Sequence, residues 1–237
     1  MTKAFIQGAG EIDESADLWP VFFADADYVY GLFPGQLWSE LLAAIPSLRP
    51  RIVETLKRGL RSDDPTHRRA AIEALRFVSS PDYAADLEHV AREHRDWLVE
   101  ARDYAGGSIL ALFLGAVVVS RAQAAFDALG DAWVATAAVD HGVEALVLFA
   151  PERAMRRVLE DAAAGFRSPI VPKLIGALVR SAVRAELLGR VRSLPLEQRT
   201  AFVATARTAM RADEFSGAFD AWLSVADEVA VPRSSGP

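Results

Sequence analysis

The sequence predicts an all-α protein built from stacked helical hairpins, and three observations support this prediction. Apolar residues recur with a period close to 3.6 residues along most of the chain after Gly35. Proline and glycine divide this pattern into lengths that are typical of single helices. No two adjacent segments combine alternating apolar residues with the tight turn of a β-hairpin. We therefore expect well over half of the residues to be helical, against about one third in an average globular protein.

Two short amphipathic helices are predicted first, around residues 37–45 and 52–60. The first stripe consists of Leu37, Trp38, Leu41, Leu42 and Ile45, and the second of Ile52, Val53, Leu56 and Leu60. Pro46 ends the first helix, because a proline ring clashes with the preceding turn. Each helix thus has one apolar face to bury against a neighbour.

A turn and a further helix are predicted in the stretch from Ser62 to Ser80, which reads SDDPTHRRAAIEALRFVSS. Asp63 or Asp64 can accept hydrogen bonds from the free N–H groups at the helix start, and Pro65 fits the first turn. The apolar side of this helix carries Ala70, Ala71, Ala74, Leu75 and Val78, while Arg69, Glu73 and Arg76 are expected together on the solvent side. The small alanines allow a neighbouring helix to approach closely.

This stretch resembles the second helix of a HEAT repeat. The resemblance rests on Asp64-Pro65, Arg68, Ala70-Ala71 and Ala74-Leu75, and it covers one repeat, roughly residues 50–79. His67 differs from the valine that is usual in the family. The resemblance implies a HEAT-like α-solenoid. Further repeats are expected to start at Pro81, Arg121, Pro151 and Pro195, with breaks at Gly106-Gly107 and near Gly130.

The rest of the repeat region is also predicted to be helical. The apolar run Ile109 to Val119 reads as a buried central helix, since it has about half of the roughly 20 residues that a membrane span needs. Residues 168–194 read as one long amphipathic helix, and Pro151 starts another. The best strand candidates are residues 146–150 (LVLFA) and the aromatic-rich residues 21–33.

The sequence divides into three parts by composition. Residues 1–46 hold an acidic, aromatic-rich and irregular cap together with the first helix, residues 47–230 the helical repeats, and residues 231–237 a disordered tail. Residues 1–46 contain one basic residue against seven acidic ones, while the whole chain carries a net charge of −6. The absence of cysteine and of a secretory signal pattern at Met1 favours the cytoplasm.

Motifs for catalysis, cofactors and metals have little support in the sequence. The stretch QGAGEID at residues 7–13 has no third glycine opening a helix, so a dinucleotide loop is disfavoured. His89 with Glu93, and His141 with Glu144, have spacings that permit metal ligation, but neither pair has a second donor set. We expect these pairs to lie on solvated charged faces, and we predict no cofactor.

Two functions of different classes remain open. The first is a non-catalytic scaffold or toxin-neutralising protein that binds a basic partner protein, with contacts from Asp13, Glu14, Asp17, Asp25, Asp27, Arg69, Glu73 and Arg76. The second is an enzyme on a HEAT-like frame, either one that processes a small molecule or one similar to the HEAT-like DNA glycosylases. The glycosylase resemblance points to Arg92, Arg95, Asp96 and Trp97. The missing basic excess disfavours nucleic acid and therefore the glycosylase hypothesis.

Overall fold

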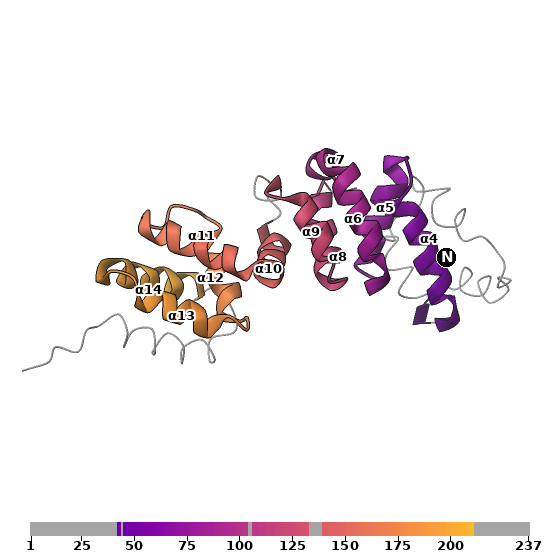
Figure 1. The fold of residues 1–237 in the computed structure, drawn as a ribbon. Helices are drawn as coiled ribbons and strands as arrows, with labels where there is room; N and C mark the ends of the chain where they lie inside the picture. The colour runs from indigo at the N-terminus through magenta and orange to yellow at the C-terminus, as the bar shows by residue number, and fades with distance from the viewer. Residues whose placement is uncertain (1–41, 44, 104–105, 133–138, 211–237) are drawn as a thin grey trace, which may run out of the picture. The chain divides into compact units, whose positions relative to one another are not determined.

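A computed structural model describes residues 42–43, 45–103, 106–132 and 139–210 of the chain. Within these ranges, helix accounts for 76% of the residues and no strand is present. The nearest approach to strand pairing there is an isolated bridge between Arg102 and Ser108. The predicted all-α class is therefore confirmed (Figure 1). Three predicted segments lie outside the described ranges. They are the aromatic-rich cap, most of the helix predicted at residues 37–45, and the tail.

The chain forms two compact units, divided between Gly142 and Val143. The described helices of the first unit are α4 (Arg49–Leu60), α5 (Pro65–Leu75), α6 (Ala84–Glu93), α7 (Arg95–Glu100), α8 (Ile109–Val119) and α9 (Gln123–Leu129), with the 3-10 turns η1 (Pro46–Leu48) and η2 (Pro81–Tyr83). In this unit α4 packs on α5, α5 on α8, and α6 on α9 (Figure 1). The division falls within α10 (Val139–Phe149).

The core of the first unit is made by the predicted apolar stripes. Ile52, Leu56 and Leu60 of α4 are fully buried, as are Ile109 and Phe113 of α8. The prediction of a buried central helix at residues 109–119 is thus confirmed for most of its length, although Val119 is 59% exposed at its end. Gly130 follows α9 with a φ of 59°, which explains the helix break expected there.

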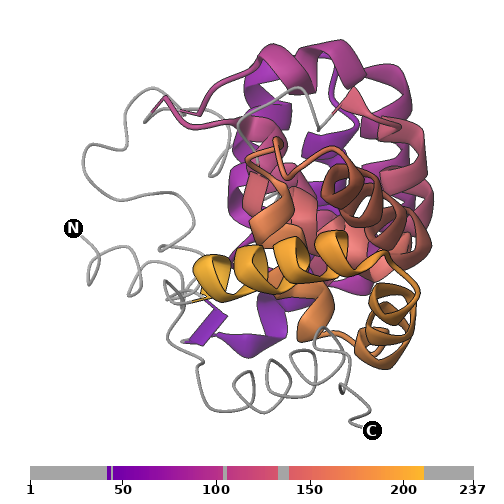
Figure 2. The same ribbon diagram turned by 90° about the vertical axis from the view of Figure 1, so that its left-hand side faces the viewer.

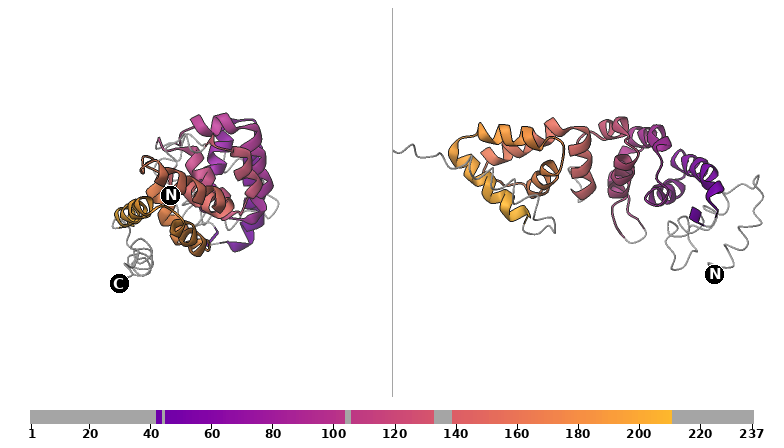
Figure 3. Two further views of the ribbon diagram at one scale, coloured as in Figure 1. Left: turned by 60° about the vertical axis from the view of Figure 1, so that its left-hand side comes forward. Right: turned by 90° about the horizontal axis from the view of Figure 1, so that it is seen from below.

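The second unit is organised around α12 (Val171–Val179). This helix packs on α11 (Pro151–Ala163), α13 (Arg184–Arg192) and α14 (Leu196–Met210). Leu174, Ile175 and Leu178 supply its fully buried side chains. Figure 2 shows α14 from the side, and the right-hand view of Figure 3 shows both units from below. As predicted, Pro151 is the first residue of a helix.

One strand candidate proved to be helical, and one prediction about helix length was wrong. The strand candidate at residues 146–150 is the end of α10, because Val143 and Leu146 bury one helical stripe and the Ala150 N–H donates to the Leu146 carbonyl. The predicted long helix at residues 168–194 is split into α12 and α13. At the split, the Ser181 hydroxyl donates to the Leu178 carbonyl and accepts from the Val183 N–H, so it competes with the helical ladder.

Among the described helices, none combines the length and the apolar character that crossing a lipid bilayer requires.

Candidate functional site

The corner between α4 and α5 is fixed by side chains that the sequence had singled out. Asp64 has extended backbone and accepts a hydrogen bond from the Thr66 N–H at 2.8 Å, and Pro65 is the first helical residue. Of the two aspartates considered as the cap, Asp64 therefore fills the role. The hydrogen bond from the Thr66 backbone holds the pKa of the Asp64 carboxyl below its ordinary value.

Replacing Asp64 by alanine is expected to lower the thermal unfolding midpoint at pH 7, whereas Asp64→Asn should nearly preserve it because asparagine also caps helices. The pKa of Asp64 is lowered in the folded chain, so its charge stabilises the fold above the unfolded pKa of about 4. The stabilisation is lost as the pH falls through the folded pKa. The difference in thermal unfolding midpoint between wild type and Asp64→Ala should therefore become smaller below pH 4. An unchanged difference would show that the carboxylate is not the cap.

Arg68 connects this corner to the next helical layer. Its side chain is 5% exposed, and its Nη1 donates to the Ser62 carbonyl at 2.5 Å. The guanidinium carbon lies 4.9 Å from the centre of the Trp97 ring, a distance at which a cation and an aromatic face attract each other. Burial lowers the pKa of Arg68. The residue therefore joins α5 to α7 by stacking and to the corner by a hydrogen bond.

Two histidines lie close together at the end of α6. The rings of His89 and His94 are arranged edge to face with centroids 6.0 Å apart. Burial lowers the pKa of His94, and the charge of Arg68 adds to this effect. Among the described residues, no group of three or more histidine, aspartate or glutamate side chains is arranged to hold a metal ion. The His89 and Glu93 spacing therefore belongs to no metal-binding group in this part of the chain.

The residues expected on the solvent side of α5 do not share one environment. Arg76 is exposed and lies over the Phe77 ring, with 4.5 Å from its guanidinium carbon to the ring centre. Arg69 is half-buried. Glu73 is only 9% exposed, so its placement on the solvent face was wrong. The neighbouring Ile72 is fully buried as well, which shows that α5 buries a wider arc than its alanine stripe alone.

The residues of the glycosylase-like alternative lie around the junction of α6 and α7. Arg92, Arg95 and Asp96 are exposed, and Arg92 forms an ion pair with Glu88 at 2.7 Å. Trp97 is half-buried and carries the Arg68 guanidinium on its ring. The Trp97 ring therefore already stacks on a side chain of the protein itself. The four residues of this alternative are neighbours in the sequence.

The acidic residues assigned to partner binding lie outside the described ranges. These are Asp13, Glu14, Asp17, Asp25 and Asp27. Their role stays a prediction from the sequence.

One ion pair between an exposed arginine and a buried carboxylate was missed by the sequence analysis. Asp86 of α6 is fully buried and accepts a hydrogen bond from Nε of Arg61, which follows α4. Close by in sequence, Tyr83 is fully buried, and its burial raises the pKa of its hydroxyl. Asp86 lies on the same side of α6 as the buried Leu87 and Val90, but a charged residue type gave no signal that its carboxylate would be inside.

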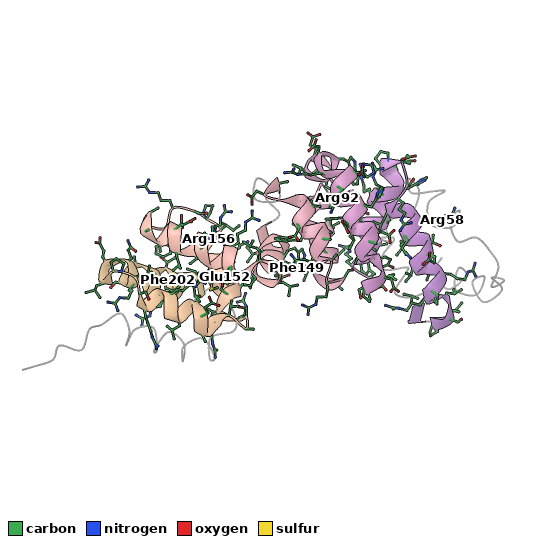
Figure 4. The ribbon with its side chains drawn as sticks, in the orientation of Figure 1. Arg58, Arg92, Phe149, Glu152, Arg156 and Phe202 are labelled. Atoms are coloured by element: carbon green, nitrogen blue, oxygen red, sulfur yellow. The ribbon has the colours of Figure 1, made fainter. Side chains whose placement is uncertain are left out.

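The second unit contains a charged cluster that the sequence analysis did not identify. Nη2 of Arg190 in α13 lies 2.5 Å from Glu152 of α11 and 2.6 Å from Glu186 of its own helix. Figure 4 labels Glu152 on α11. The two carboxylates raise the pKa of Arg190, and its guanidinium lowers that of Glu186. The i, i+4 spacing of Glu186 and Arg190 was visible in the sequence, but the link to Glu152 required the packing of the helices.

Comparison with known families supports the fold of the first unit. Residues 39–103 match the family described as HEAT repeats. The resemblance inferred from residues 50–79 is therefore confirmed, and the matched stretch runs from before α4 through α7. Comparisons with curated proteins and with solved structures gave no match.

Proposed function

We propose that this chain is a non-catalytic helical-repeat scaffold that binds a partner protein. The HEAT repeats at residues 39–103 are the observation that carries the proposal. Stacked helical hairpins form extended surfaces, and such surfaces commonly bind other proteins. In the described first unit, buried side chains such as Leu56 and Arg68 hold the layers together, while Arg58 and Arg76 remain at the surface. The repeat thus combines a frame of buried side chains with charged groups at its surface.

The proposed partner is basic. Residues 1–46 carry seven acidic side chains and one basic one, and this asymmetry favours attraction to positive charge. Charges of this kind act mainly on the rate of encounter, and salt screens them over about 8 Å at physiological ionic strength. Asp13, Glu14, Asp17, Asp25 and Asp27 are the proposed attracting residues, and scaffolding or toxin neutralisation is the proposed kind of role. Arg76 of α5 is exposed and is proposed to contact the partner directly.

The test is an association measurement with a partner first captured from the source cell and then purified. Changing Asp13, Glu14 and Asp17 to the corresponding amides is expected to slow association and to flatten its dependence on salt. A control with the same change in charge is Glu93→Gln, Glu100→Gln and Glu160→Gln, since these three glutamates are exposed. The control should associate at nearly the wild-type rate, and far-ultraviolet circular dichroism should show unchanged helix in both.

Two outcomes would contradict the proposal. Equal slowing in both variants would mean that net charge, rather than the acidic stretch, determines the rate. Tight binding of duplex DNA in a gel-shift titration at moderate salt, lost on changing Arg92 or Arg95, would instead support the glycosylase-like alternative.

A further inference from the structure

The described part of the second unit has a basic excess that contrasts with the acidic character of the whole chain. Residues 143–210 contain eleven basic residues against six acidic ones, although the chain as a whole carries −6. Two of the six acidic residues, Glu152 and Glu186, form ion pairs with the same arginine, Arg190. The basic excess over the remainder of this unit is therefore larger than the simple count suggests.

Part of this excess gathers on one side of α11. Arg153, Arg156 and Arg157 have the i, i+3 and i+4 spacings that bring side chains together on a helix surface. The opposite side of α11 is anchored, since Ala154, Met155 and Val158 are fully buried. Arg156 is exposed, and Figure 4 labels it on α11. The arginines therefore stand on a helix whose orientation is fixed by packing.

The loop after α11 carries a fourth arginine, the exposed Arg167. The Phe166 N–H donates to the Asp161 carbonyl at 2.8 Å, and the Ser168 N–H donates to the Asp161 carboxylate at 3.2 Å. The backbone at Arg167, between them, is thus held beside Asp161, which stands one turn beyond Arg157 on α11. The Phe166 ring also packs against Phe202 of α14, with centroids 6.2 Å apart. The loop that presents Arg167 is therefore fastened at two points.

Two of the three acidic residues of α11 are engaged by groups other than Arg156 and Arg157. Asp161 stands four residues after Arg157, where an ion pair is common, but its carboxylate accepts from the Ser168 backbone. Glu152 is bound to Arg190. Within the described part of the chain, neither Arg156 nor Arg157 forms an ion pair with a carboxylate. Glu160 is the remaining acidic neighbour on α11.

We propose that Arg153, Arg156, Arg157 and Arg167, the α11 arginine face, bind an acidic polypeptide segment of a partner protein. Guanidinium groups form paired hydrogen bonds with carboxylates, and a row of them on one helix fits a run of glutamates or aspartates. Duplex DNA is a poorer fit, since specific complexes use many phosphate contacts over about 1,000 Å² or more. This surface is separate from the acidic stretch that the proposed function uses.

The direct test is fluorescence anisotropy of a fluorescein-labelled decaglutamate peptide titrated with the full-length protein at low and physiological salt. Wild type is expected to bind, more weakly at the higher salt. The triple variant R156Q/R157Q/R167Q should bind roughly tenfold more weakly, since each exposed ion pair contributes a fraction of a kcal/mol. The variant R156K/R157K/R167K keeps the charge but loses the paired geometry, and it should fall between the two.

The matched control is R58Q/R92Q/R95Q, which removes three exposed charges from the first unit. Arg58 and Arg92 are labelled in Figure 4. We expect this control to bind decaglutamate within about twofold of wild type, since it leaves the local charges of α11 intact. Circular dichroism should show the same helix content in every variant.

Three outcomes would overturn the inference. The first is no binding of decaglutamate to wild type even at low salt. The second is equal loss in the α11 variant and the control, which would indicate a response to net charge alone. The third is tighter binding of a 20-base-pair duplex than of decaglutamate, lost in R156Q/R157Q/R167Q, which would assign the same surface to nucleic acid.

Discussion

Leu75→Ala is expected to lower the free energy of unfolding by about 2–5 kcal/mol, because it removes a buried side chain and leaves a cavity. Leu75 is 2% exposed at the end of α5, beside the fully buried Ala71 and Ile72. Urea unfolding followed by circular dichroism at 222 nm measures the effect. The substitution should shift the midpoint of the unfolding transition to a lower urea concentration.

The adjacent residue provides the control for this substitution. Arg76 is exposed, so Arg76→Ala should change the free energy of unfolding by no more than about 0.5 kcal/mol. If Arg76→Ala proved the more damaging of the two, the assignment of the faces of α5 would be wrong.

Arg68→Ala is expected to cost about 2–4 kcal/mol, because it removes a charged hydrogen bond to the Ser62 carbonyl and the stacking on Trp97. A double-mutant cycle with Trp97→Leu isolates the stacking, which should contribute about 0.5–2 kcal/mol of coupling. Arg68→Lys should recover only part of the loss, since lysine has no planar group to stack. A coupling of zero between positions 68 and 97 would show that the two side chains do not support each other.

The sequence predicted the helical hairpins because their signals are local. Asp64, Pro65 and the apolar stripe through Leu75 specify where α5 begins and which residues it buries. Pro151 and Gly130 mark other boundaries in the same way. These residues act on the backbone within a few positions, so their effect can be inferred without knowing what packs against the helix.

The features that the sequence analysis missed depend on groups far apart in the chain or on competing local bonds. Glu73 is buried by neighbours that periodicity does not reveal. Asp86 meets Arg61 across 25 positions, and Glu152 meets Arg190 across 38. Ser181 stands in a stretch whose apolar pattern continues through it, yet its hydroxyl hydrogen-bonds to two backbone groups at the point where α12 and α13 are separated. The α11 arginine face was missed for a similar reason, since the backbone amide of Ser168 occupies the carboxylate that would otherwise be available to Arg157.

The connection between α5 and η2 is tied to helices on both sides of it. Arg49 Nη2 donates to the Ser79 carbonyl at 2.6 Å, and the buried Ser120 hydroxyl donates to the Ser80 carbonyl at 2.9 Å. Arg61 adds its hydrogen bond to Asp86 across the same boundary between repeats. In a repeat protein, bonds of this kind are the nearest-neighbour terms that set how far local opening spreads. Opening of α4 breaks bonds that also hold the following repeat, so we expect these helices to exchange their amide hydrogens as one cooperative group.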